Sequence, residues 1–144
     1  MKATEPPVIV EESFECSSEV LWEALTNPDK MKEWYFDNIP DFRPEIGFET
    51  RFPVHVEDRT YTHIWNISEV IPEKKLVHSW RFEEHPGDAF VSFEIFSEAN
   101  GSKLKLTNTV TEDFPDDIPE FRRESCEEGW KYFIKQRLKE YLET

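Results

Sequence analysis

The residues of this sequence that could do chemistry are four histidines, two cysteines and one arginine in an apolar stripe. His55, His63, His78 and His85 have no cysteine or carboxylate at a metal-ligand spacing. The four glycines form neither a phosphate-binding loop nor a nucleophile elbow. We therefore expect no metal, no cofactor and no catalytic residue of a recognised motif.

Two histidines keep an enzymatic alternative open. His63 and His78 both fall on the apolar face of an alternating segment. Either imidazole, with a carboxylate beside it, could form an acid–base pair inside a cavity. Cys126 has two interpretations as well. The dipole of a helix start could lower its pKa, or the residue could be a small buried part of the core.

Arg137 is the charged residue that a solid core explains least easily. It follows Trp130 by seven positions and Phe133 by four, so all three share one face of a helix. Its guanidinium could bind an anionic or carbonyl group of a ligand. It could equally reach the rim of the fold or pair with a carboxylate.

Aromatic residues give the strongest indication of a binding site. They alternate along several segments and predict one aromatic face, which suits either a pocket for an apolar ligand or a solid core. Polar residues on that face favour the pocket, because a buried polar group without a partner costs about 1–3 kcal/mol, and several together indicate either a wet cavity or mutual hydrogen bonds. These polar residues are Thr50, His63, His78, Asn108 and Arg137. The candidate ligand-binding residues are Trp34, Phe52, His63, Trp65, His78, Trp80, Phe82, Phe93, Trp130, Phe133 and Arg137.

Residues 118–144 must carry part of this face as a helix. Apolar side chains recur there in steps of three and four, at Cys126, Trp130, Phe133, Ile134, Leu138, Tyr141 and Leu142. Such a stripe needs a large surface to cover. The spacing of Ser125 and Glu128 is that of a capping box and predicts a helix start at that point.

The rest of the chain predicts the sheet that this apolar stripe would cover. Residues 8–14 indicate a first strand, although Glu12 interrupts its alternation, and Ser17 or Ser18 can cap a following helix that ends at Asn27. A second short helix follows over 29–34, and Pro28 suits its first position. Period-two segments at 48–54, 61–68, 76–82, 91–95 and 104–110 are separated by turns at 57–59, 71–75, 84–88 and 99–102. Pro53 predicts an edge strand or a bulge.

These elements predict an α+β fold. We expect a curved antiparallel sheet of about six to seven strands, two short helices after the first strand, and a long C-terminal helix packed across the sheet. The length of 144 residues fits a single domain over 1–144, with 1–6 flexible.

Composition narrows the partners and the compartment. Acidic residues outnumber basic ones by 31 to 17, giving a net charge of −14, which argues against nucleic acid and anionic membrane surfaces. No apolar run reaches the ~18 residues of a membrane span, and no signal-peptide core is present. Two cysteines make no disulfide framework, so we expect a cytoplasmic protein.

Four segments, in this order, resemble a known family. They are residues 19–28, the aromatic patch 34–36, the strand–turn–strand 69–80 that ends in Trp80, and Gly129-Trp130 of the closing helix. The arrangement resembles the helix-grip superfamily of START and birch-pollen-allergen-like domains, and within it the family named after the activator of Hsp90 ATPase. The resemblance covers nearly the whole chain. Trp65 stands where that family often has glycine, so we expect any cavity to be reduced or reshaped.

The resemblance and the aromatic face together lead to three functional hypotheses. The first is a non-catalytic module that binds a small apolar or amphipathic ligand between sheet and C-terminal helix. The second, implied by the family name, is an Hsp90-associated co-chaperone-like or stress-response protein with a chaperone partner. The third is an enzyme of the cyclase or dehydratase type that uses the same cavity. A monomer and a homodimer are both compatible with an edge strand at 8–14.

Overall fold

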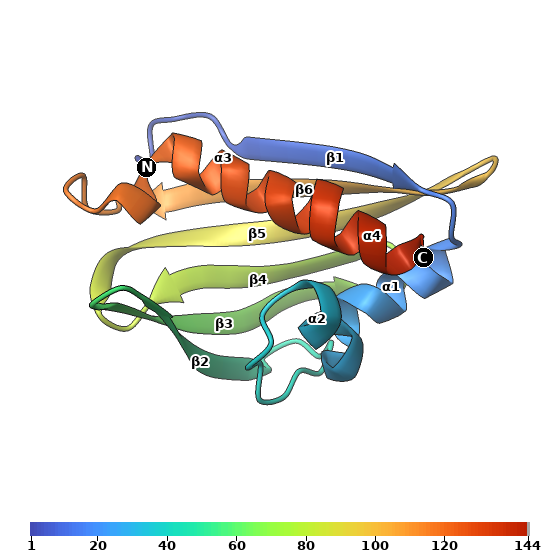
Figure 1. Ribbon diagram of the computed structural model, residues 1–144, viewed down its shortest axis with the longest axis horizontal. Helices are drawn as coiled ribbons and strands as arrows, with labels where there is room; N and C mark the ends of the chain where they lie inside the picture. The colour runs from blue at the N-terminus through green and yellow to red at the C-terminus, as the bar shows by residue number, and fades with distance from the viewer. Residues whose placement is uncertain (144) are drawn as a thin grey trace.

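A six-stranded antiparallel sheet, crossed by one long C-terminal helix, forms the protein (Figure 1). The computed structural model describes residues 1–143, and Thr144, the expected end of the closing helix, lies outside them. The elements are β1 (Val8–Phe14), α1 (Ser18–Thr26), α2 (Pro28–Trp34), β2 (Glu49–Val56), β3 (Arg59–Ile71), β4 (Lys75–Phe82), β5 (His85–Glu98), β6 (Gly101–Glu112), η1 (Pro119–Phe121), α3 (Arg123–Lys131), η2 (Tyr132–Leu138) and α4 (Lys139–Leu142). This arrangement confirms the predicted α+β helix-grip fold.

The sheet is a meander from β2 to β6, with β1 added beside β6. Its order, β1-β6-β5-β4-β3-β2, makes β2 an edge strand, as Pro53 predicts, because proline lacks the N–H that a ladder bond needs. The expected hairpin after β5 forms one residue earlier than the Asn-Gly pair suggests. Gly101 already belongs to β6, and a Cβ there would collide with the carbonyl oxygen of Phe14.

The helix starts agree with the sequence in two cases and differ in the third. Ser17 Oγ accepts from the Val20 N–H at 3.2 Å and caps α1, and Pro28 occupies the first turn of α2. The predicted capping box at Ser125 is wrong. The chain leaves η1 through the extended backbone of Arg122 and enters the helix at once, so α3 begins at Arg123.

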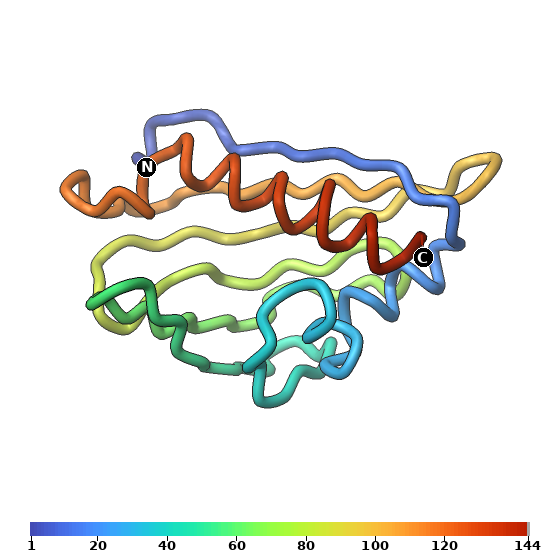
Figure 2. The backbone as a smooth tube through the Cα atoms, viewed as in Figure 1, coloured from blue at the N-terminus to red at the C-terminus, as the bar shows by residue number. Residues whose placement is uncertain are grey.

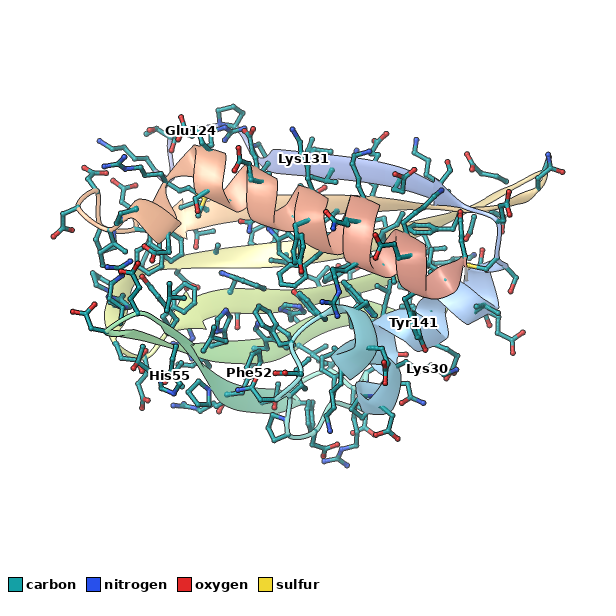
Figure 3. All side chains as sticks on the ribbon, in the orientation of Figure 1. Lys30, Phe52, His55, Glu124, Lys131 and Tyr141 are labelled. Carbon is teal, nitrogen blue, oxygen red and sulfur yellow. The ribbon has the colours of Figure 1, made fainter. Side chains whose placement is uncertain are left out.

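The closing segment runs as one continuous helix through α3, η2 and α4 (Figure 2). The middle part, η2, has the wider π-type winding, and Lys131 and Leu138 at its ends keep right-handed helical backbone angles. Trp130, Ile134 and Leu138 are buried against the sheet. Glu124 and Lys131 stand on the exposed side (Figure 3). The predicted amphipathic stripe is therefore confirmed.

Glu12 interrupts the alternation of β1 because the helix gives it two partners. Lys135 and Lys139, one turn apart, each lie 3.7 Å from its carboxylate. The same two lysines donate hydrogen bonds to the backbone carbonyls of Glu11 and Ser13. The closing helix is thereby held against the edge strand.

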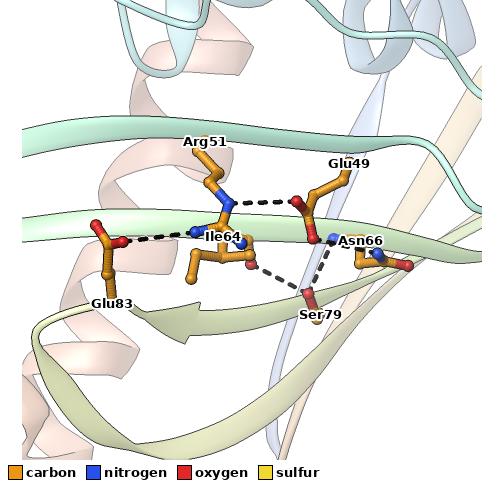
Figure 4. A network of polar contacts seen from close by, with 6 residues as sticks. All are labelled: Glu49, Arg51, Ile64, Asn66, Ser79 and Glu83. Carbon is orange, nitrogen blue, oxygen red and sulfur yellow. Dashed lines mark hydrogen bonds and ion pairs between the residues drawn. The ribbon is translucent and has the colours of Figure 1, made fainter.

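Ile64 is buried on the outer face of the sheet, where alternation predicts a polar residue. Figure 4 shows the polar network around it. Ser79 Oγ accepts from the Asn66 N–H at 2.9 Å and donates to the Ile64 carbonyl at 3.1 Å, so a side chain completes this part of the β3–β4 ladder. Arg51 lies opposite Ile64 in the register and pairs with Glu49 and Glu83 at 3.2 and 3.6 Å.

The first six residues pack along the segment that follows β6. The Ala3 N–H donates to Asp113 Oδ1 at 2.7 Å, and Arg123 donates to the carbonyls of Pro6 and Pro7. These contacts bring the N-terminus beside the start of α3 (Figure 1). None of the helices formed by residues 1–143 has the length and apolar character needed to cross a membrane.

Candidate functional site

A cavity of about 340 Å³ lies between α3 and the end of the sheet that carries the β2–β3 and β4–β5 turns. This end is opposite to α1 (Figure 1). Most of the lining is apolar or aromatic. It consists of Met1, Phe36, Val54, Val56, Tyr61, His63, Trp80, Phe82, Glu120, Phe121, Ser125, Cys126, Gly129, Trp130 and Phe133. Such a lining suits an apolar ligand held by a few polar groups.

The aromatic walls of the cavity come from sheet, helix and loop. Trp80 of β4 and Trp130 of α3 have ring centroids 5.1 Å apart. Phe36, which follows α2, lies 5.1 Å from Phe133 across the cavity wall. At the other side Phe121 of η1 packs at 5.1 Å from Phe82. These separations are typical of aromatic pairs in well-packed walls.

His63 supplies a buried polar group to this lining. Its side chain is 5% exposed, and burial lowers its pKa to about 4, so the imidazole is neutral at pH 7. Nδ1 lies 3.0 Å from the Tyr61 carbonyl oxygen. Because a carbonyl only accepts, Nδ1 carries the proton and Nε2 keeps a lone pair. His63 is therefore a hydrogen-bond acceptor for whatever occupies the cavity.

Glu120 lines the cavity and is paired with Arg59, which lies outside the lining. The Arg59 guanidinium binds the Glu120 carboxylate and also donates to Tyr61 Oη at 3.1 Å. The hydrogen bond from Arg59 holds the pKa of Glu120 below its usual range. This pair ties η1 to the start of β3, and it neutralises the carboxylate of the lining.

Cys126 is a partly buried thiol packed against the core, and it does not have the lowered pKa of a nucleophile. Burial raises its pKa to about 12, and this outweighs the field of the helix start. Its sulfur lies 3.6 Å from Nδ2 of Asn108, the inner-face amide that the sequence singles out. The thiol therefore stays protonated at neutral pH.

Gly129 leaves room where any other residue would fill it. A Cβ at this position would have no atom within 4 Å outside its own helix. Close packing against the sheet therefore does not explain this glycine, and neither does a helix start, since α3 begins six residues earlier. The structural consequence of Gly129 is open space toward the cavity.

The structure brings five of the eleven predicted site residues to the cavity and places the other six elsewhere. The five are His63, Trp80, Phe82, Trp130 and Phe133. Trp34, Phe52, Trp65, His78 and Phe93 are buried in the adjoining core. Arg137 donates to the Glu33 carbonyl at 2.8 Å, so it completes hydrogen bonding at the end of α2 and lies outside the cavity.

The region beside the cavity is filled by rings, and we call it the filled half. It comprises Trp34, Tyr35, Phe52, Trp65 and His78. Tyr35 stacks on Trp34 at 4.6 Å and on Trp65 at 5.3 Å, while His78 lies 4.7 Å from Trp65. The large ring of Trp65 thus occupies the middle of the fold.

Two donors in the filled half have no partner within residues 1–143. They are Tyr35 Oη and Trp65 Nε1, both fully enclosed. Burial alone raises the pKa of Tyr35 well above its usual value. The rings are therefore packed tightly enough to leave a hydroxyl unsatisfied, a cost of about 1–3 kcal/mol.

Sequence reasoning missed several lining residues, and for some of them a signal existed. Tyr61 and Val54 belong to the alternating inner-face positions of the predicted strands, so treating the whole inner face as candidate lining would have included them. Glu120 and Phe121 lie in an irregular segment where no periodicity applies. Only the folded chain places them at the cavity.

The acid–base arrangement needed for the third hypothesis is not formed by hydrogen bonds. His78 Nδ1 lies 2.8 Å from the Ser79 carbonyl oxygen, and burial lowers its pKa to about 4. Within residues 1–143, His63 and His78 are hydrogen-bonded to backbone carbonyls and neither is bonded to a carboxylate. In the same residues no three side chains of His, Cys, Asp or Glu converge as a metal site.

Comparisons with known proteins agree with this architecture. A family model described as Activator of Hsp90 ATPase homolog 1-like protein matches residues 15–143. No curated protein sequence matches the chain. Protein CV1439 from Chromobacterium violaceum is 17% identical, with a TM-score of 0.80 over 96% of this chain and 98% of that one.

Two further solved structures are similar. Protein MLL2253 from Mesorhizobium loti is 25% identical, with a TM-score of 0.75 over 94% of this chain and 96% of that one. The Aha1 dimer from Colwellia psychrerythraea, solved in solution, is 18% identical, with a TM-score of 0.74 over 96% and 97% of the two chains.

Proposed function

The chain belongs to the Activator of Hsp90 ATPase homolog 1-like protein family, and from that premise we propose that it is a non-catalytic module that binds a small apolar or amphipathic molecule. The observation that carries the proposal is the aromatic cavity of about 340 Å³ under Gly129. Its volume lies near the lower end of the about 300–1,000 Å³ usual for small-molecule sites.

Three features support ligand binding over a chance packing defect. Residues of the sheet, of α3 and of η1 all contribute to the lining, so the cavity lies where these elements meet. A glycine in a helix interior costs about 1 kcal/mol relative to alanine, and here no close contact compensates for it. Nε2 of His63 provides an acceptor inside an otherwise apolar lining.

A cavity-filling substitution tests the proposal. Gly129→Leu places a branched side chain into the open space, whereas Glu128→Leu adds the same side chain on the exposed face of α3. We expect naphthalene, titrated into the ¹⁵N-labelled protein, to shift the amide signals of Phe36, Gly129 and Trp130. Gly129→Leu should lose this response and Glu128→Leu should keep it. No response in the wild type, or an equal response in both variants, contradicts the proposal.

Native mass spectrometry of the protein purified from its own organism identifies the natural occupant. A retained small molecule supports the binding role and gives the chemical class. The two free cysteines fit a reducing compartment, so we place this role in the cytoplasm.

A chaperone-directed role is the second candidate, and the name of the family favours it. It predicts that the protein binds Hsp90 or changes its ATPase rate. Absence of both effects in a coupled ATPase assay and in a binding assay would remove this candidate. The dimer named for the Colwellia structure also motivates a homodimer for this chain, which sedimentation velocity measures directly.

A further inference from the structure

The polar groups of the cavity define a ligand class more narrowly than its apolar walls do. We propose that the ligand is a small uncharged aromatic molecule that donates one O–H or N–H hydrogen bond to Nε2 of His63. This inference rests on the proposed function, because it concerns the occupant of the same cavity.

The acceptor at His63 is fixed by the backbone. Nδ1 is held 3.0 Å from the Tyr61 carbonyl oxygen and keeps the proton, so Nε2 presents only a lone pair. Nε2 takes part in no hydrogen bond within residues 1–143, and the side chain is 5% exposed. Nε2 is not fully enclosed and is open to the cavity, so a ligand that covers it without donating a hydrogen bond leaves it unsatisfied, whereas a donor satisfies it. A ligand that offers only acceptors leaves both groups unsatisfied.

The charges around the cavity disfavour an anion. No lysine or arginine side chain belongs to the lining, and the guanidinium of Arg59 beside it is already bound to Glu120. The amino group of Met1 is held by the Phe121 carbonyl at 2.6 Å. A carboxylate ligand would therefore lose its hydration and meet at most one cation of the lining, the partly engaged Met1 amino group, and it would face a protein of net charge −14.

The walls favour a planar ring system. Trp80 and Trp130 lie 5.1 Å apart at 57°, and Phe36 lies 5.1 Å from Phe133 at 61°, so faces and edges of rings border the same space. Aromatic molecules gain from offset and edge contacts with such walls. The volume of about 340 Å³ limits the ligand to a small ring system.

Three naphthalene derivatives separate these requirements at pH 7 by isothermal titration calorimetry of the full chain. 2-Naphthol has the donor, 2-methoxynaphthalene keeps the oxygen without the donor, and 2-naphthoate is an anion. We expect 2-naphthol to bind about tenfold more tightly than either of the others, the difference that one buried hydrogen bond produces. The long-range ¹H–¹⁵N spectrum should show the unprotonated ring nitrogen of His63 shifting only with 2-naphthol.

A matched pair of variants assigns the effect to His63. His63→Phe should reduce the preference for 2-naphthol over its methyl ether to near unity. His78→Phe should keep it, because that imidazole is also buried and carbonyl-bound yet lies outside the lining. If His63→Phe does not fold, the comparison of the three ligands on the wild type still tests whether the ligand must donate a hydrogen bond. Equal affinities for naphthol and ether, or tightest binding of naphthoate, overturn the donor rule and leave the binding role intact. Binding of no derivative overturns both.

Discussion

The space between the closing helix and the sheet is divided into two regions that take their rings from the same strands. β2 contributes Phe52 to the filled half and Val54 to the cavity, and β3 contributes Trp65 to the first and His63 to the second. The strands alone therefore do not decide which region is solid. The difference comes from the irregular segments that cover each end.

The segment after α2 inserts side chains deep into the filled half. Tyr35 stacks on Trp65, and Ile39 and Phe42 are almost completely buried. The segment after β6 behaves differently, because Phe114 and Phe121 pack on each other at 5.3 Å and on Phe82 at the end of the sheet. Glu120 and Phe121 of this segment line the cavity that Trp80 and α3 also border. A helix-grip fold can thus be solid at one end and hollow at the other.

The largest expected difference between the two regions is in the cost of removing an indole. Trp65→Ala should lower the free energy of unfolding by about 3–5 kcal/mol, because the ring is 1% exposed and packed on every side. Trp80→Ala should cost only about 2 kcal/mol, since its half-buried ring already borders open space. Guanidinium denaturation measures both. Equal losses would show that the cavity end is packed as tightly as the filled half.

Acid should weaken the fold through one imidazole in each region. Burial lowers the pKa of His63 and His78 from 6.5 to about 4, so the unfolded chain takes up these protons at a higher pH than the folded one. Stability from this source is complete above pH 6.5 and falls as the pH drops toward 4, by roughly 3 kcal/mol for each imidazole.

Urea denaturation at intervals from pH 7.5 to 4 checks this expectation. His78→Phe removes the contribution of the filled half and should flatten the dependence by about half. A wild-type stability that does not change with pH in this range, or a variant with an unchanged dependence, would contradict the pKa shifts.

Two tyrosines should respond in opposite directions to loss of the hydroxyl. Tyr35→Phe in the filled half should raise the free energy of unfolding by about 1 kcal/mol, because its Oη is buried without a partner in residues 1–143. Tyr61→Phe at the cavity should lower it by about 1 kcal/mol, because its Oη accepts from Arg59. Thermal denaturation of the two variants side by side gives the sign of each effect. A loss of stability in Tyr35→Phe would reveal a partner for that hydroxyl.

The smallest effect concerns two glycines that both have open space around them. Gly129→Ala should raise the free energy of unfolding by about 0.8 kcal/mol, because alanine favours the helix and its Cβ meets no atom. Gly47→Ala should lower it by about 1 kcal/mol, because the φ angle of +89° there disfavours a Cβ although the space is equally open. Chemical denaturation compares the pair, and a destabilised Gly129→Ala would mean that the cavity is narrower than described.

The fold was predictable because its signals are local. The alternation of β2 to β6, Ser17 and Pro28 at the helix starts, and the stripe from Trp130 to Leu138 each report an environment that repeats along the chain. The family resemblance then supplied the order of the elements, which periodicity alone does not give.

The extent of the cavity was not predictable in the same way. Placing Trp65 inside was correct, yet whether its ring lines a space or fills it depends on Tyr35, which lies outside any regular element. Arg137 shares the helical face of Trp130, but its long side chain reaches the end of α2 instead of the cavity. Residue type and spacing predict which side chains face inward. Whether a cavity remains between them depends on every segment that packs against that face.

Three indoles run in a row from the filled half into the cavity wall, with Trp65 at 5.9 Å from Trp80 and Trp80 at 5.1 Å from Trp130. At such separations their excited states are shared between neighbours, so the near-ultraviolet circular dichroism of this protein reports the geometry of the whole row. Only the last two rings border the cavity. Filling the cavity therefore changes the surroundings of Trp80 and Trp130 directly, and because Trp80 also neighbours Trp65 the change extends along the row, so the protein carries its own spectroscopic indicator of occupancy.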